Sequence, residues 1–103
     1  MKVRLACSFR SRLRGLLGKD ELDGALLLAP CRSIHTHGMR RSIDVAFLSE
    51  EGTVLEAHRG VPPGRRLGNR SAVAVLERFA SADSWFDESG AKVEIDSMDG
   101  RWL

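Results

Sequence analysis

The chain contains 103 residues, of which 43% are hydrophobic and 29% are charged, a composition typical of one globular domain over residues 1–103. The net charge is only +2, but residues 1–50 carry nine Lys and Arg against five Asp and Glu, and residues 51–103 carry seven against nine. No apolar run reaches the roughly 20 residues of a membrane-spanning helix, and the first six residues lack the apolar core of a secretory signal. We therefore expect a cytoplasmic protein whose two cysteines form no disulfide framework.

Hydrophobic periodicity predicts the elements in chain order. Residues 1–6 alternate as a short strand. Over Ser8–Leu17, apolar residues recur at helical spacing and predict the main helix. Apolar runs and alternating patterns predict strands at 25–29, 43–49, 53–58, 72–78 and 92–97. The segment 61–69 is rich in Pro, Gly and Arg and indicates a loop, and the segment 80–88 indicates a short second helix.

The order of these elements favours an α+β fold. Most strands follow one another as hairpins instead of alternating with helices. We therefore predict a single compact domain with a curved, barrel-like sheet of mixed or antiparallel strands, on which the N-terminal helix packs.

The segment Cys31–Met39 contains two of the three histidines and one of the two cysteines. If the segment is extended, alternation places five side chains on one face: Cys31, Ser33, His35, His37 and Met39. Cysteine and imidazole are ligands that Zn²⁺ or copper prefers, and Asp44 or His58 could complete such a set. No metal-site spacing motif supports it, so we predict neither a metal nor a cofactor.

The same segment contains a candidate nucleophile, Cys31, with His35 or His37 as its base. Asp44 and Glu77 are candidates to orient that base. Asp44 interrupts one predicted apolar strand, and Glu77 ends the apolar run of another. Each carboxylate either faces solvent at a strand edge or is held by a partner.

Nucleotide and nucleic-acid binding are not expected. Neither GxGxxG nor GxxxxGK[ST] occurs, and none of the six aromatic residues lies among the arginine clusters, where it could stack on bases.

Several short motifs follow one another in a recognisable order. Arg14-Gly-Leu-Leu-Gly18 comes first, Ser33–Met39 and Ile43–Leu48 come next, and Ala74–Glu77 comes last. This order resembles the domain of unknown function 192 family (DUF192) of bacteria and archaea over residues 10–96. The resemblance implies a compact α+β domain with a barrel-like sheet and no assigned reaction. Many members carry aromatic-Met-Lys-Asn-Thr where this chain has His37–Arg41, which places His35 and His37 at the centre of any site.

The favoured interpretation is a small binding module with a polar cleft for a small polar or anionic ligand. Its binding residues are His35, Thr36, His37, Met39 and Asp44, with Arg40 and Glu77 near the rim. One alternative is a small metal-assisted or Cys/His-dependent enzyme. The other is a protein-interaction domain that presents Arg10, Arg12 and Arg14 on its helix to an acidic partner.

Overall fold

The computed structural model describes residues 3–6 and 24–86 of the chain. Within these residues every regular element is a strand, and no helix occurs. The strands are β1 (Val3–Ala6), β2 (Ala25–Leu28), β3 (Ser33–His35), β4 (Ile43–Leu48), β5 (Val54–Val61), β6 (Arg66–Gly68) and β7 (Ala74–Phe79).

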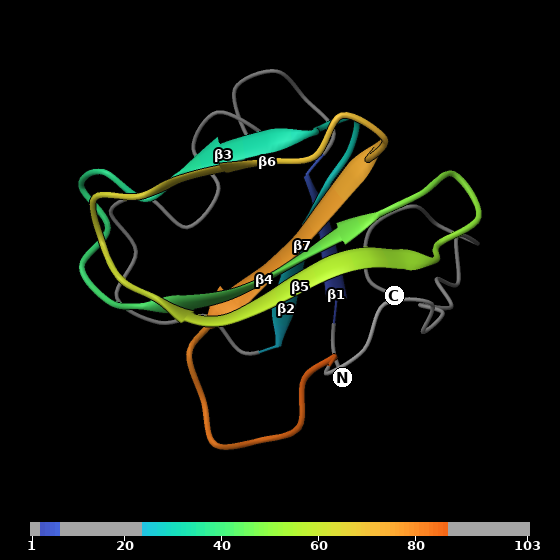
Figure 1. The fold of residues 1–103 in the computed structure, drawn as a ribbon. Coiled ribbons are helices and arrows are strands. Elements are labelled where there is room, and N and C mark those ends of the chain that lie inside the picture. The colour runs from blue at the N-terminus through green and yellow to red at the C-terminus, as the bar shows by residue number, and fades with distance from the viewer. Residues whose placement is uncertain (1–2, 7–23, 87–103) are drawn as a thin grey trace.

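The strands form one five-stranded and one two-stranded sheet. The larger sheet has the order β1-β2-β7-β4-β5. Only β1 and β2 pair in parallel, and the other neighbours are antiparallel, so the sheet is mixed. The strands β3 and β6 form an antiparallel ribbon that lies over one face of the larger sheet (Figure 1). The described strands β5 and β6 do not pair with each other, so the barrel-like arrangement is open between them.

The fold class therefore needs correction. The described part of the chain is all-β, not α+β, because the layer that covers one face of the sheet there is a ribbon of strands. The helix predicted at 8–17, its basic face and the strand predicted at 92–97 lie outside the described residues.

The short second helix predicted at 80–88 is wrong over residues 80–86. Residues 80–86 have irregular backbone with bends. Two carbonyls of this segment accept hydrogen bonds from arginine side chains of the sheet: Arg59 Nη2 donates to Ser81 O and Asp83 O, and Arg78 Nη2 donates to Asp83 O. These side-chain bonds satisfy carbonyls that a helix would satisfy along its own backbone.

Burial on both faces of the central strands explains their nearly continuous apolar sequences. Every residue of β4 and β7 is buried. One face carries an inner core cluster between the sheet and the ribbon, which includes Leu26, Leu28, Met39, Ile43, Val45, Phe47, Val61, Ala72, Val75 and Phe79. The opposite face carries an outer core cluster of Ala25, Leu27, Ala46, Leu48, Val54, Ala74, Leu76 and Trp85. Complete burial of one large apolar side chain stabilises the fold by about 1.5–3 kcal/mol.

A β-bulge interrupts the pairing of β5 with β4. Ile43 pairs with Val61 and Val45 pairs with His58, so β5 contains one extra residue in this interval. Gly60 lies there with a φ of 62°, in the left-handed region that glycine adopts without steric cost. Its amide donates to Asp44 Oδ1 at 2.9 Å. The bulge therefore supplies a donor to a carboxylate of the neighbouring strand.

Candidate functional site

Thr36 joins the two turns that carry the predicted histidines and two arginines. Its side chain is fully buried. Thr36 Oγ1 accepts a hydrogen bond from Arg65 N and donates one to Pro62 O, both at 2.7 Å. The Thr36 amide also donates to Arg65 O at 2.7 Å. These bonds lock the turn at 36–39 against the turn at 62–65, so Thr36 can support a site from below but cannot itself reach a ligand.

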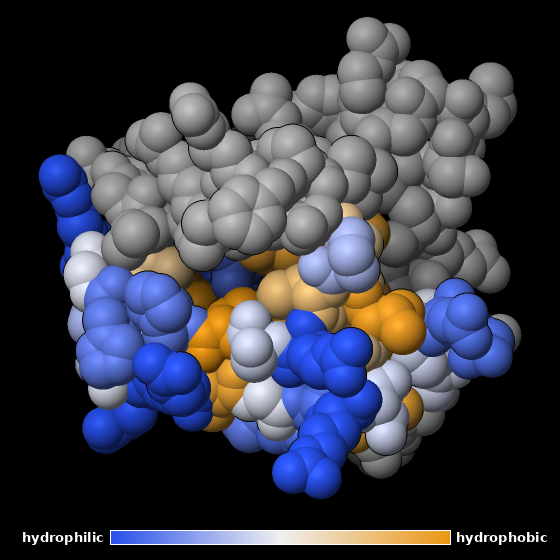
Figure 2. All heavy atoms as spheres, turned by 90° about the horizontal axis from the view of Figure 1, so that it is seen from above, coloured by the Kyte–Doolittle hydropathy of each residue, from blue (hydrophilic) through white to orange (hydrophobic). Residues whose placement is uncertain are grey.

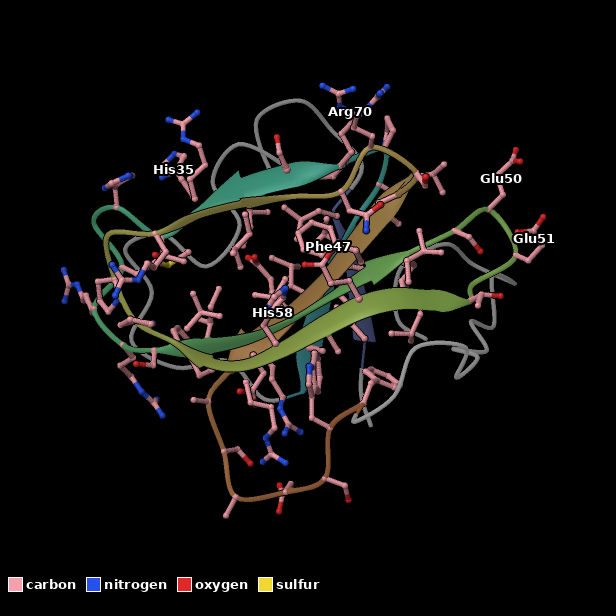
Figure 3. All side chains as sticks on the ribbon, viewed as in Figure 1. His35, Phe47, Glu50, Glu51, His58 and Arg70 are labelled. Carbon is pink, nitrogen blue, oxygen red and sulfur yellow. The ribbon has the colours of Figure 1, made fainter. Side chains whose placement is uncertain are left out.

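Four exposed basic residues lie on or next to these turns, and they are here termed the basic patch: His35, His37, Arg65 and Arg66. His35 and Arg66 pair across the ribbon, and the ring centroids of His35 and His37 are 5.5 Å apart. Figure 3 shows His35 pointing away from the core beyond β3. Within the described part of the chain, neither Arg65 nor Arg66 forms an ion pair with a carboxylate. No carboxylate of the described residues therefore neutralises these two guanidinium groups.

The acidic hairpin between β4 and β5 lies far from the basic patch. Glu50 and Glu51 are exposed on the hairpin between β4 and β5, at the opposite end from His35 in Figure 3. Seen from above, strongly hydrophilic residues stand in several groups across the face, and hydrophobic atoms are visible between them (Figure 2). An anion approaching the basic patch therefore meets no described carboxylate on these two turns.

Two more of the predicted site residues lie at the end of the turn at 36–39 or directly after it. Met39 is 9% exposed and belongs to the inner core cluster, so its side chain packs beneath the turn. Arg40 is exposed at the end of the turn. The structure thus brings His35, His37 and Arg40 to the surface and uses Thr36 and Met39 to anchor them.

Asp44 lies on the other face of the sheet. It alternates with Val45 along β4, so it points toward the outer core cluster, where it is 1% exposed. Its Oδ2 accepts from Arg78 Nε at 2.8 Å. The Arg78 guanidinium also lies over the ring of Trp85, with its carbon 4.5 Å from the ring centroid. Of the two interpretations open for Asp44, the structure has the partnered one, and the ion pair joins strands instead of lining the patch.

Glu77 is also fully buried, at the centre of the larger sheet. It pairs with Leu26 on one side and Val45 on the other, and its side chain shares the inner face with Val75 and Phe79. Neither Asp44 nor Glu77 lies on the two turns. Cys31, the predicted nucleophile, is partly buried against the inner cluster, and its thiol donates to Ser33 O at 3.3 Å.

A second polar cluster, not selected from the sequence, involves Glu56, His58 and Asn69. Glu56 Oε2 lies 2.5 Å from His58 Nε2, and Glu56 Oε1 accepts from Asn69 Nδ2 at 3.0 Å. The pKa of Glu56 is lowered below its ordinary 4.5. The largest cause is the hydrogen bond from Asn69, and the hydrogen bond and charge of His58 are further causes. Alternation along the predicted strand 53–58 would have placed Glu56 and His58 on one face. No local signal would have added Asn69.

Metal binding has little support from side-chain placement. Among residues 24–86, no three side chains of His, Cys, Asp or Glu stand together in a way that could hold a metal ion. His35 and His37 therefore lack a third protein ligand within that range.

The amino-acid sequence matches the model of one protein family along most of its length. The DUF192 family model, described as an uncharacterized ACR, matches residues 1–95. The chain belongs to the DUF192 family. The resemblance inferred from the motif order is confirmed, and the family carries no assigned function.

Two solved structures are similar to this DUF192 domain. A protein of unknown function from Novosphingobium aromaticivorans DSM 12444 matches 90% of this chain and 74% of its own, with a TM-score of 0.74 and 19% identity. A protein described as a proposed transcription regulator from Sinorhizobium meliloti 1021 matches 76% of this chain and 67% of its own, with a TM-score of 0.67 and 21% identity. Identities this low show a shared fold alone. No curated protein sequence matches the chain.

In the part of this DUF192 domain that the structure describes, no helix has the length and apolar character needed to cross a membrane.

Proposed function

We propose that this DUF192 domain binds a small anionic ligand at the basic patch. The observation that carries the proposal is the buried Thr36 network, which locks together two turns on or next to which the exposed side chains of His35, His37, Arg65 and Arg66 lie. Guanidinium groups bind phosphate or carboxylate oxygens in pairs, and imidazoles add further N–H donors. The chemical class is therefore a phosphate- or carboxylate-bearing small molecule.

Two features of the patch favour binding. Among the described residues, no carboxylate competes with a ligand for Arg65 or Arg66. The backbone beneath them is already fixed by Thr36, so binding orders side chains but not the turns. Such preorganisation lowers the entropic cost of association.

The proposed site differs in extent from the one expected from the sequence. It keeps His35 and His37 and adds Arg65 and Arg66, with Arg40 at its rim. Thr36 and Met39 support it from the interior. Asp44 and Glu77 are buried within the sheet and take no part in it.

Titration of ¹⁵N-labelled full-length chain with pyrophosphate, and separately with acetate, tests the proposal. We expect saturable chemical-shift changes at the imidazoles of His35 and His37 and at the amides of the two turns. The variant Arg65→Ala/Arg66→Ala should weaken pyrophosphate binding at least about tenfold, which is a loss of about 1.4 kcal/mol.

The matched control is Arg32→Ala/Arg70→Ala, which removes two exposed arginines near the other end of the ribbon (Figure 3 labels Arg70). This variant should change the affinity by less than about twofold, because the local contacts at the patch remain. Equal weakening in both variants would indicate non-specific attraction to net charge. That result, or a linear response without saturation, would overturn the proposal.

A further inference from the structure

His58 is held by a carboxylate at one ring nitrogen and by an aromatic ring at its side. It lies on β5 and shares the inner face with Glu56, two residues earlier. Its Nε2 contacts Glu56 Oε2 at 2.5 Å, and its ring stands at 90° to the Phe47 ring with centroids 6.4 Å apart. Figure 3 shows His58 beside Phe47, between β5 and the ribbon. These contacts fix the orientation of the imidazole.

Asn69 in turn fixes Glu56. The backbone amide of Asn69 donates to Arg32 O at 2.9 Å, and the side-chain oxygen Asn69 Oδ1 accepts from Ser71 N at 3.0 Å. With the carboxamide oxygen occupied in this way, Asn69 Nδ2 faces Glu56 Oε1 at 3.0 Å. The chain of hydrogen bonds therefore runs from the loop after β6, across the open edge between the sheets, to His58 on β5.

The bonding of Glu56 determines which nitrogen of His58 is available. An ionised carboxylate only accepts hydrogen bonds, so His58 Nε2 donates to Glu56. In the neutral form of the ring, Nδ1 then carries the lone pair. Nδ1 has no hydrogen-bond partner among the described residues. No buried side-chain nitrogen or oxygen among those residues is left without a partner, so Nδ1 reaches the surface. The side chain of His58 is 34% exposed.

We propose that His58 Nδ1 is a nucleophile for neutral, activated acyl groups, with Glu56 and Asn69 as positioning residues. Nδ1 would attack the carbonyl carbon of an ester, the N–C bond would form, and the leaving oxygen would depart with its electron pair. The ring would then be an acylimidazolium whose Nε2 proton is held by Glu56. Water would add to the acyl carbon, the N–C bond would break, and the carboxylic acid and one proton would be released, which restores neutral His58.

The surroundings of His58 select the class of substrate. The negative charge of Glu56 stabilises the positive ring that forms during attack, as the acidic member of a catalytic triad does. The same charge disfavours an anionic substrate. Leu55 and Leu67 are partly buried against the inner cluster on the strands at either side of the opening, and their surfaces favour a neutral, partly apolar acyl compound. This site shares no residue with the basic patch, so the two proposals stand or fall separately.

Hydrolysis of 4-nitrophenyl acetate by the full-length chain tests the nucleophile. We expect His58→Ala to lower the second-order rate at least about tenfold, and mass spectrometry of a quenched wild-type reaction to place the acetyl group on His58. The control Glu50→Gln changes an exposed residue on the hairpin between β4 and β5 and should leave more than about half of the rate. A rate that is unchanged in His58→Ala, or an acetyl group that mass spectrometry places on another residue, would refute the proposal.

Glu56→Gln tests positioning with a readout that a purely structural role would not move. The amide has the shape of the carboxylate but no charge, so we expect the ¹⁵N shifts of the His58 ring to leave the Nε2–H pattern and the acylation rate to fall about tenfold. Circular dichroism would check that the variant stays folded. If the folded variant keeps both the ring shifts and the rate of the wild type, Glu56 has no positioning role.

Discussion

Replacing Asp44 by Asn should destabilise the fold strongly, because it removes one charge of a buried ion pair. Asp44 is 1% exposed and Arg78 is 8% exposed. Asp44 Oδ2 accepts from Arg78 Nε at 2.8 Å, and Oδ1 accepts from Gly60 N at 2.9 Å. An Asn side chain can keep the bond from Gly60 through its oxygen, but its NH₂ group then faces the Arg78 donor.

The expected magnitude follows from what Arg78 retains. Loss of one partner from a buried pair costs about 3–5 kcal/mol. Arg78 still donates to Asp83 O at 2.7 Å and still lies over the ring of Trp85, so the lower end, about 3 kcal/mol, is appropriate. Because 1 kcal/mol shifts the Tm of a domain of this size by about 4–8 °C, the expected decrease is roughly 12–24 °C.

Urea denaturation followed by circular dichroism at pH 7 measures this effect. The exposed Glu50→Gln is the control and should stay within about 0.5 kcal/mol of the wild type. A double-mutant cycle with Arg78→Met should give a coupling of about 1–3 kcal/mol, because the double variant no longer buries an uncompensated charge. A cost of Asp44→Asn below about 1 kcal/mol, or a coupling near zero, would refute the reasoning.

Three further predictions concern the turns, the bulge and the Glu56 cluster. Thr36→Val removes the hydrogen bonds of Oγ1 and leaves Arg65 N without that acceptor, so urea denaturation should show a loss of about 2 kcal/mol in unfolding free energy. A loss below about 0.5 kcal/mol would contradict the role of Thr36 as an anchor. Gly60→Ala should lower the unfolding free energy by about 1 kcal/mol from the positive φ alone, since a Cβ there meets nothing within 4 Å. The control is Gly68→Ala, at a position without a positive φ, and thermal denaturation should show it to be nearly neutral. The folded-state pKa of Glu56 is lowered by its bonds to Asn69 and His58, so its stabilising contribution is complete above the unfolded-state pKa and disappears as the pH falls through the folded-state pKa. The difference in unfolding free energy between wild type and Glu56→Gln, measured in urea from pH 7 to pH 3, should therefore shrink below about pH 4.3. A difference that stays constant with pH would contradict the lowered pKa of Glu56.

Local pattern was sufficient for strands that are buried or that alternate. The segments expected at 25–29, 43–49, 53–58 and 72–78 correspond to β2, β4, β5 and β7. The strand β6 was missed, because three residues, Arg66–Gly68, in a segment rich in Pro, Gly and Arg have no recognisable alternation. Its strand structure comes from pairing with β3, which is a contact between segments far apart in the sequence.

The candidate site was predictable only where its members are neighbours in the sequence. His35 and His37 are two residues apart, and their proximity follows from that spacing. Arg65 and Arg66 join them only through the ribbon register and the Thr36 hydrogen bonds. The predicted participation of Asp44 and Glu77 assumed that polar residues in apolar strands mark a site, whereas both are buried within the sheet.

The sequence by itself determined the family, the positions of the main strands and the concentration of histidines in one short segment. These properties depend on motif order and on period-two alternation, which act over a few residues. The tertiary structure alone decided that the described part is all-β, that Asp44 pairs with Arg78, and that Asn69 orients Glu56 toward His58. The physical reason is that pairing register and hydrogen-bond partners are set by packing between distant segments, and a local pattern of residues contains no information about which distant donor will satisfy a buried acceptor.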